Sequence, residues 1–145
     1  MRRLALAVFA FAMTSGACAQ LAAGTWVMRE TPQVSMVVEP MGVGYSITYH
    51  IVGNDGKQVT MTLQTLLDGS ETPFLINGKP TGQTYAGKRV DSRHTMGVIK
   101  MNGQPVATSK AELSADGKTI TVENDNTAAA GGTSAGKRIE HWDKR

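Results

Sequence analysis

Cysteine is almost absent from this chain of 145 residues, because its single cysteine is Cys18, close to the start. Small exported domains commonly compensate for a limited core with disulfides. A domain that begins after Cys18 has no disulfide, and it has no thiolate for catalysis or metal binding. Such a domain must therefore be stabilised by its own hydrophobic core.

Long apolar runs are also scarce, and the clearest one covers residues 4–13. It follows the basic residues Arg2 and Arg3, and small residues lead from it to Gln20. This order is typical of a secretory signal peptide, and the run is shorter than the roughly 20 residues that a membrane-spanning helix needs. We expect residues 1–19 to be a signal peptide that is cleaved before Gln20.

Removal of that peptide leaves residues 20–145 as one domain, which is long enough to bury an adequate core. We expect it to be exported, either periplasmic or secreted, and not inserted in a membrane. An alternative comes from the residues before Cys18, which resemble a degraded lipobox with Ser15 in place of the usual leucine. Lipid attached to Cys18 would then anchor the protein to a membrane surface.

An excess of charge is missing too. The formal charge is +3, of which Arg2 and Arg3 supply two, so +1 remains after the signal peptide. The other Lys and Arg residues are spread along the chain except near its end, and they form no basic helix. Because nucleic acids and anionic membranes are recognised through dense positive charge, neither is expected as a partner. The oligomeric state does not follow from the sequence.

Patterns that carry catalysis or bind metals are not found in the sequence either. His50, His94 and His141 do not have the spacing of metal ligands. The Gly-x-Ser-x-Gly match in "GGTSAG" at residues 131–136 lacks the preceding buried strand and the following helix of a nucleophile elbow. No phosphate loop or dinucleotide fingerprint occurs. We therefore expect a protein that is not an enzyme, with no catalytic residue, no metal and no cofactor.

Turn dipeptides, in contrast, are abundant. Asn-Gly and Asp-Gly adopt positive φ at little cost, as tight hairpin turns require. They occur at five places, namely residues 54–57, 68–69, 77–79, 102–104 and 116–118. Five such pairs in one small domain predict a series of consecutive hairpins.

The runs between these turns alternate apolar and polar side chains, as half-buried strands do. The clearest runs are residues 45–52, 59–67, 96–101, 106–113 and 118–124. They predict an all-β domain of about 8–10 antiparallel strands. An up-and-down barrel fits this pattern best, and a two-layer β-sandwich is the alternative. Residues 124–136, rich in Ala, Gly and Thr, are expected to form a connection before the last strand.

One face of the alternating runs supplies candidates for a ligand-binding interior. They are Tyr45, Ile47, Tyr49, Ile51, Met61, Leu63, Val98 and Met101. Tyrosines and methionines among aliphatic side chains suit an apolar pocket with a few polar groups. The same residues could instead fill a solid core, because a barrel of about eight strands can do either. The sequence slightly favours the filled or nearly filled interior.

Three stretches resemble a family of small exported bacterial proteins with a lipocalin-like barrel, most of them uncharacterised. They are "GTWVM" at residues 24–28, the strands and turns of residues 86–123, and "GKRIEHWDKR" at residues 136–145. Together they touch both ends and the middle of the domain. The resemblance implies a lipocalin-like β-barrel.

The resemblance also implies a role for the Gly-x-Trp motif, here Gly24 and Trp26. In lipocalins this tryptophan packs across the closed end of the barrel, and a basic side chain near the last strand stacks on it. Arg138 is the first candidate for that side chain and Arg145 is the second. A cation over an indole face gains about 0.5–2 kcal/mol.

Two functions remain open at this point. The first is an exported, non-enzymatic barrel that binds a small hydrophobic or amphipathic ligand in its interior. The second is a structural or protein-interaction module of the cell envelope, with a filled core and no ligand. A well-formed apolar cavity of about 300 Å³ or more would favour the first function over the second.

Overall fold

The structure is a computed structural model that describes residues 22–127 and 135–145. The expected signal peptide, residues 1–19 with Cys18, lies outside the described residues. So does the centre of the connection expected at residues 124–136. The strands on either side of that connection are described, and they extend to Asn126 and restart at Gly136.

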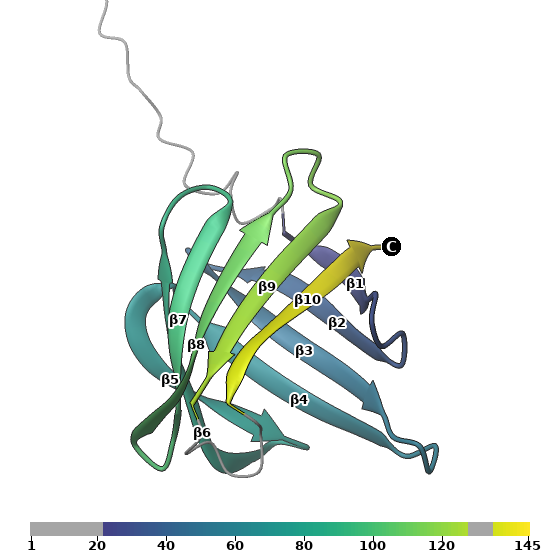
Figure 1. Cartoon of the computed structure of the whole chain (residues 1–145), viewed down its shortest axis with the longest axis horizontal. Coiled ribbons are helices and arrows are strands. Elements are labelled where there is room, and N and C mark those ends of the chain that lie inside the picture. The colour runs from purple at the N-terminus through teal and green to yellow at the C-terminus, as the bar shows by residue number, and fades with distance from the viewer. Residues whose placement is uncertain (1–21, 128–134) are drawn as a thin grey trace, which may run out of the picture.

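Ten antiparallel strands form a single closed barrel (Figure 1). Each strand pairs with the next along the chain, and the first pairs with the last. The strands are β1 (Gly24–Met28), β2 (Val34–Met41), β3 (Gly44–Val52), β4 (Gln58–Thr65), β5 (Asp68–Ile76), β6 (Lys79–Arg89), β7 (His94–Met101), β8 (Gln104–Leu113), β9 (Thr119–Asn126) and β10 (Gly136–Lys144). This confirms the all-β up-and-down barrel, and the two-layer sandwich is ruled out because one sheet closes on itself. Within the described ranges, no helix has the length and apolar character to cross a membrane.

Four of the five predicted turns connect strands as expected. Asn77-Gly78 and Asn102-Gly103 have positive φ at both residues, which is the requirement of a type I′ turn. Gly56 and Gly117 supply positive φ in two longer turns. The fifth prediction is wrong, because Asp68-Gly69 begins β5 and the preceding turn lies at residues 66–67. Leu67 takes the positive φ of 57° there, a conformation that the sequence pattern does not reveal.

The hydrophobic core lies toward one end of the barrel, where the odd-numbered strands begin; we call this the closed end. Trp26 is fully buried there. Along β3 the inward side chains pass from buried Tyr45 to partly exposed Ile51. Along β10 they pass from Trp142 at the closed end to exposed Arg138. The opposite end, which we call the open end, is therefore accessible to water.

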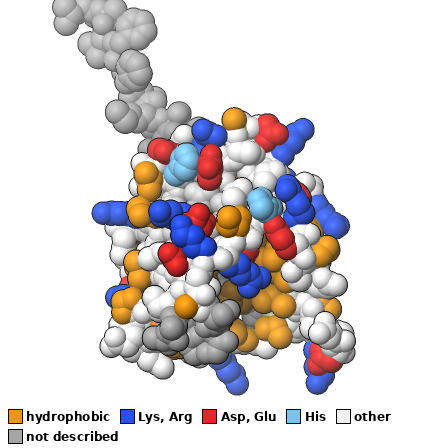
Figure 2. All heavy atoms as spheres, in the orientation of Figure 1, with side chains coloured by type: hydrophobic (Ala, Val, Ile, Leu, Met, Phe, Trp, Pro, Cys, Tyr) orange, Lys and Arg blue, Asp and Glu red, His pale blue; other side chains and the backbone are white. Residues whose placement is uncertain are grey.

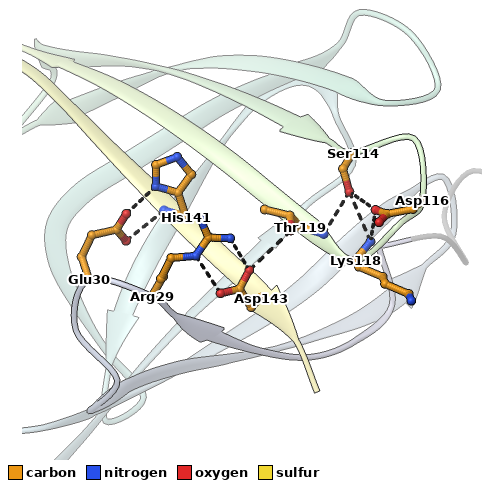
Figure 3. A network of polar contacts seen from close by, with 8 residues as sticks. All are labelled: Arg29, Glu30, Ser114, Asp116, Lys118, Thr119, His141 and Asp143. Carbon is orange, nitrogen blue, oxygen red and sulfur yellow. Dashed lines mark hydrogen bonds and ion pairs between the residues drawn. The ribbon is translucent and has the colours of Figure 1, made fainter.

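The seam between β1 and β10 closes the barrel with a short ladder. Only residues 26–28 of β1 have Cα partners on β10. Figure 3 shows two polar contacts that extend this ladder, from Arg29 to Asp143 and from Glu30 to His141. In the described part of the chain, the first half of β10 pairs with β9 alone. Among the described residues, that half of β10 therefore has a hydrogen-bonded neighbour strand on one side only.

Candidate functional site

The barrel interior holds a cavity of about 480 Å³. Its wall includes Met28, Val34, Met36, Phe74, Ile99 and Val122 among many apolar side chains. Figure 2 shows hydrophobic side chains set back in the lower part of one face, where Figure 1 places β10 in front of β3 and β4. The expectation of a filled interior is therefore wrong. A ring of ten strands is wider than a ring of eight, and the available side chains do not fill it.

Most of the predicted interior residues line this cavity. They are Tyr45, Ile47, Tyr49, Ile51, Met61 and Leu63, all on β3 and β4. Every second residue of these two paired strands faces the same side of the sheet, so strict alternation in the sequence identified the inward face. Whether these residues contact a ligand stays a prediction.

Val98 and Met101 on β7 are not among the lining residues, whereas Ile99 is. Ile99 and Val98 are consecutive and so face opposite sides of the wall. Met101 shares the parity of Ile99, but the pairing of β7 with β8 shifts register after Ile99, and Met101 is 36% exposed. The run "MGVIKM" is apolar on both faces, so alternation could not identify the inward one.

Three consecutive inward residues of β10 form a graded row from the closed end to the open end. Trp142 is 2% exposed. The Glu140 side chain is 16% exposed and the Arg138 side chain is 62% exposed. Arg138 Nε lies 3.5 Å from Glu140 Oε1, and all three residues line the cavity. Sequence reasoning missed Glu140, although its alternation with Arg138 and Trp142 in "RIEHW" could have placed it on the inward face.

Glu140 shares the cavity with three tyrosines, Tyr45, Tyr49 and Tyr85. Burial raises the pKa of the Glu140 carboxyl, while Arg138 and Trp142 act in the opposite direction and Glu30 adds the smallest upward effect. Burial also raises the pKa of Tyr49, and the negative charge of Glu140 and the electrostatic coupling to Tyr85 add to that increase. Tyr49 packs edge-on against Trp142, with ring centroids 5.9 Å apart. Arg138, Tyr49 and Trp142 are thus the cavity-lining groups that act on Glu140 or respond to its charge.

The position of Tyr85 is fixed by two glycines. A Cβ atom at either Gly87 or Gly97 would overlap the Tyr85 ring, so the ring occupies the space that these residues leave empty. Gly87 and Gly97 are direct partners across β6 and β7. On its other side, Tyr85 meets Phe74 edge-on with centroids 6.3 Å apart. Burial raises the pKa of Tyr85, which keeps its hydroxyl neutral inside the cavity.

Two arginines line the cavity at the closed end, and both are held by the backbone. Arg89 donates to the Val43 carbonyl at 3.1 Å, and its guanidinium lies over the Tyr45 ring. Arg93 donates to the Leu113 carbonyl at 3.4 Å. Each guanidinium therefore already has an acceptor within the fold.

Gly24 and Trp26 lie at the closed end, where the resemblance placed them. The Trp26 Nε1 donates to the Ala22 carbonyl at 2.9 Å. The cation over the indole is Lys144, whose Nζ lies 5.4 Å from the ring centroid. A Cβ atom at Gly24 would lie 3.0 Å from Lys144 Cε, and Gly24 has a φ of +132°, so glycine suits this position.

Arg138 was the wrong choice for the stacking cation, and so was Arg145. Trp26 is opposite Lys144 in the β1/β10 register. Arg138 is six residues earlier on β10, which places it about 20 Å away along the strand. It faces the same side of the sheet, but at the open end of the barrel, beside Glu140.

The three histidines lie apart from one another, each with its own polar neighbours. His50 Nδ1 is 2.9 Å from the Gln58 amide, and His141 contacts Glu30. His94 lies between Asp91 and Glu112. Within the described residues, no group of three or more His, Cys, Asp or Glu side chains could hold a metal ion.

Comparison with known proteins adds no relative to this geometry. A scan against protein-family models finds no match, and searches of the curated proteins and of the solved structures find none either. The cavity and its polar row are therefore the basis for any statement about function.

Proposed function

We propose that this protein is an exported, lipocalin-like, non-enzymatic barrel that binds a small hydrophobic or amphipathic molecule in its interior. The observation that carries the proposal is the cavity of about 480 Å³, which lies within the range of about 300–1,000 Å³ typical of small-molecule sites. Its wall is mainly apolar, and a few polar groups converge inside it. The signal-peptide pattern of residues 1–19 supports export.

The alternative, a cell-envelope module with a filled core and no ligand, has less support. Its premise was a packed interior, and the cavity removes that premise. Engineered apolar cavities of about 150 Å³ already bind small hydrocarbons. A cavity three times that size with water access at one end is a more plausible binding site than a packing defect.

Native mass spectrometry of the purified protein tests the proposal. We expect a population whose extra mass disappears when the protein is extracted with organic solvent and refolded. A thermal-shift panel of fatty acids, quinones and haem then provides a second readout, because a ligand that binds only the folded barrel raises its melting temperature. Absence of both a co-purified mass and any thermal shift would contradict the proposal.

A further inference from the structure

Among the described residues that line the cavity, Glu140 is the one carboxylate. It comes from the middle of β10, between the buried Trp142 and the exposed Arg138. A mostly buried carboxylate is unfavourable unless a cation or hydrogen-bond donor compensates it. The cations and hydrogen-bond donors already around Glu140 therefore determine whether its carboxylate can pair with a ligand.

That compensation is weak. Arg138 approaches Glu140 through Nε at 3.5 Å, and 62% of the Arg138 side chain is exposed. An ion pair whose cation is this exposed contributes little, because water competes for the guanidinium. The other cavity-lining arginines are held by the Val43 and Leu113 carbonyls at the closed end. A hydrogen bond from the Trp142 side chain adds to the effect of Arg138, but burial still raises the pKa of Glu140 against both of them.

We propose that Glu140 selects amphipathic amines, whose ammonium group pairs with its carboxylate while the hydrocarbon tail occupies the apolar cavity. This inference rests on the proposed function, because it names the ligand class of the same cavity. The polar row on β10 has the required order. Glu140 lies one inward position, about 7 Å, from Trp142 and the same distance from Arg138.

The neighbours of Glu140 fit an ammonium group. Tyr49 on β3 is close enough for the Glu140 charge to raise the pKa of its hydroxyl, and a neutral tyrosine hydroxyl can accept a hydrogen bond from an ammonium group. Arg138 is free to turn into water when an ammonium group replaces it, because most of its side chain is already exposed. A fatty carboxylate would instead be placed beside a carboxylate of the same sign in a partly buried setting.

Two substitutions on the same face of the same strand separate these possibilities. Glu140→Gln removes the carboxylate, and Arg138→Gln removes its competing cation. If Glu140 selects amines, the first weakens amine binding and the second strengthens it. If a carboxylate ligand binds through Arg138 instead, Glu140→Gln strengthens binding of that ligand and Arg138→Gln weakens it.

The experiment measures how well dodecylamine, dodecanol and dodecanoate displace a neutral apolar fluorophore from the wild-type protein and both variants. It is done at neutral pH and below micelle-forming concentrations. We expect dodecylamine to bind best, and Glu140→Gln to weaken it about tenfold or more, the size of a hydrogen bond to a charged group. Arg138→Gln should strengthen it several-fold. Dodecanol is the control, and its unchanged affinity shows that the cavity of each variant is intact.

The other outcomes overturn either the amine selectivity or the proposed binding function. Equal displacement by all three compounds, or preference for dodecanoate with weakening by Arg138→Gln, overturns the amine selectivity and leaves the proposed binding function standing. An affinity for dodecylamine that does not change in Glu140→Gln does the same. Failure of the fluorophore to bind the wild-type protein at all overturns the proposed function itself.

Discussion

Trp26 fixes the closed end of the barrel through contacts that need no ligand. The indole is fully buried, its Nε1 donates to the Ala22 carbonyl, and Lys144 lies over the ring. The Gly-x-Trp motif is thus explained by packing, because Gly24 leaves room for the stem of Lys144. Trp26 therefore stabilises the fold, and the residues that would bind a ligand lie nearer the open end of the barrel.

Substitution Trp26→Ala should lower the free energy of unfolding by about 3–5 kcal/mol, because it removes a large buried side chain from a packed core. Chemical denaturation of the purified variant measures this change. The comparison variant is Lys144→Ala, which removes only the cation over the ring and should cost less than about 1 kcal/mol. A Trp26→Ala variant that kept its stability and lost only ligand binding would contradict the assigned role.

Glu30 gives the seam a pH dependence. Hydrogen bonds from the backbone N–H and the ring of His141 lower the pKa of Glu30 from its ordinary value of 4.5 to about 2. A lowered carboxyl pKa stabilises the folded state above pH 4.5, and this contribution is lost as the pH falls toward 2. Urea denaturation of wild type and Glu30→Gln should therefore differ at neutral pH and converge in acid. A difference that is independent of pH would exclude this role of the carboxylate.

At the scale of the elements, the paired strands β6 and β7 show how backbone positions shape the site. Gly87 and Gly97 leave the space in which the Tyr85 ring lies. The Tyr85 ring and its hydroxyl thereby lie against the wall at these two glycines, instead of projecting farther into the cavity. The two glycines are thus determinants of the cavity, although neither contributes a side chain to it.

Substitution Gly97→Ala should push the Tyr85 ring into the cavity, weaken binding of an apolar probe, and destabilise the fold by about 1–3 kcal/mol through overpacking. Probe titration and chemical denaturation measure the two effects. Adding Tyr85→Leu to the same chain removes the bulky ring, and it should recover part of the lost stability. If the double variant is no more stable than Gly97→Ala alone, the clash with Tyr85 is not the cause.

The elements also show where sequence reasoning succeeds and fails. Strict alternation on β3 and β4 identified their inward faces, and Asn-Gly pairs identified two type I′ turns. Asp68-Gly69 failed as a turn because β5 already begins at Asp68, and Gly69 has its positive φ of 90° within that strand. The chain turns before it, at Leu67, whose own positive φ local propensity does not predict. Lys144 was missed as the cation over Trp26 because register across the β1/β10 seam depends on barrel closure.

At the scale of the whole molecule, the barrel is asymmetric. Its closed end holds both tryptophans in a packed core. At its open end Arg138 is exposed, and the first half of β10 pairs with β9 alone among the described residues. The sequence could predict a closed barrel, since turns and alternation are local. The sequence could not predict the volume of the cavity, because that volume depends on the radius of a ten-stranded barrel and on how the inward side chains pack against one another.

Filling the cavity tests the central claim most directly. Ser109 on β8 lines the cavity, while its neighbour Thr108 is exposed on the opposite face of the same strand. Titration with a neutral apolar fluorophore should show binding to the wild-type protein and to Thr108→Trp, and strongly reduced binding to Ser109→Trp. Equal binding by the two variants, or no binding to the wild-type protein, would contradict a ligand site inside the barrel.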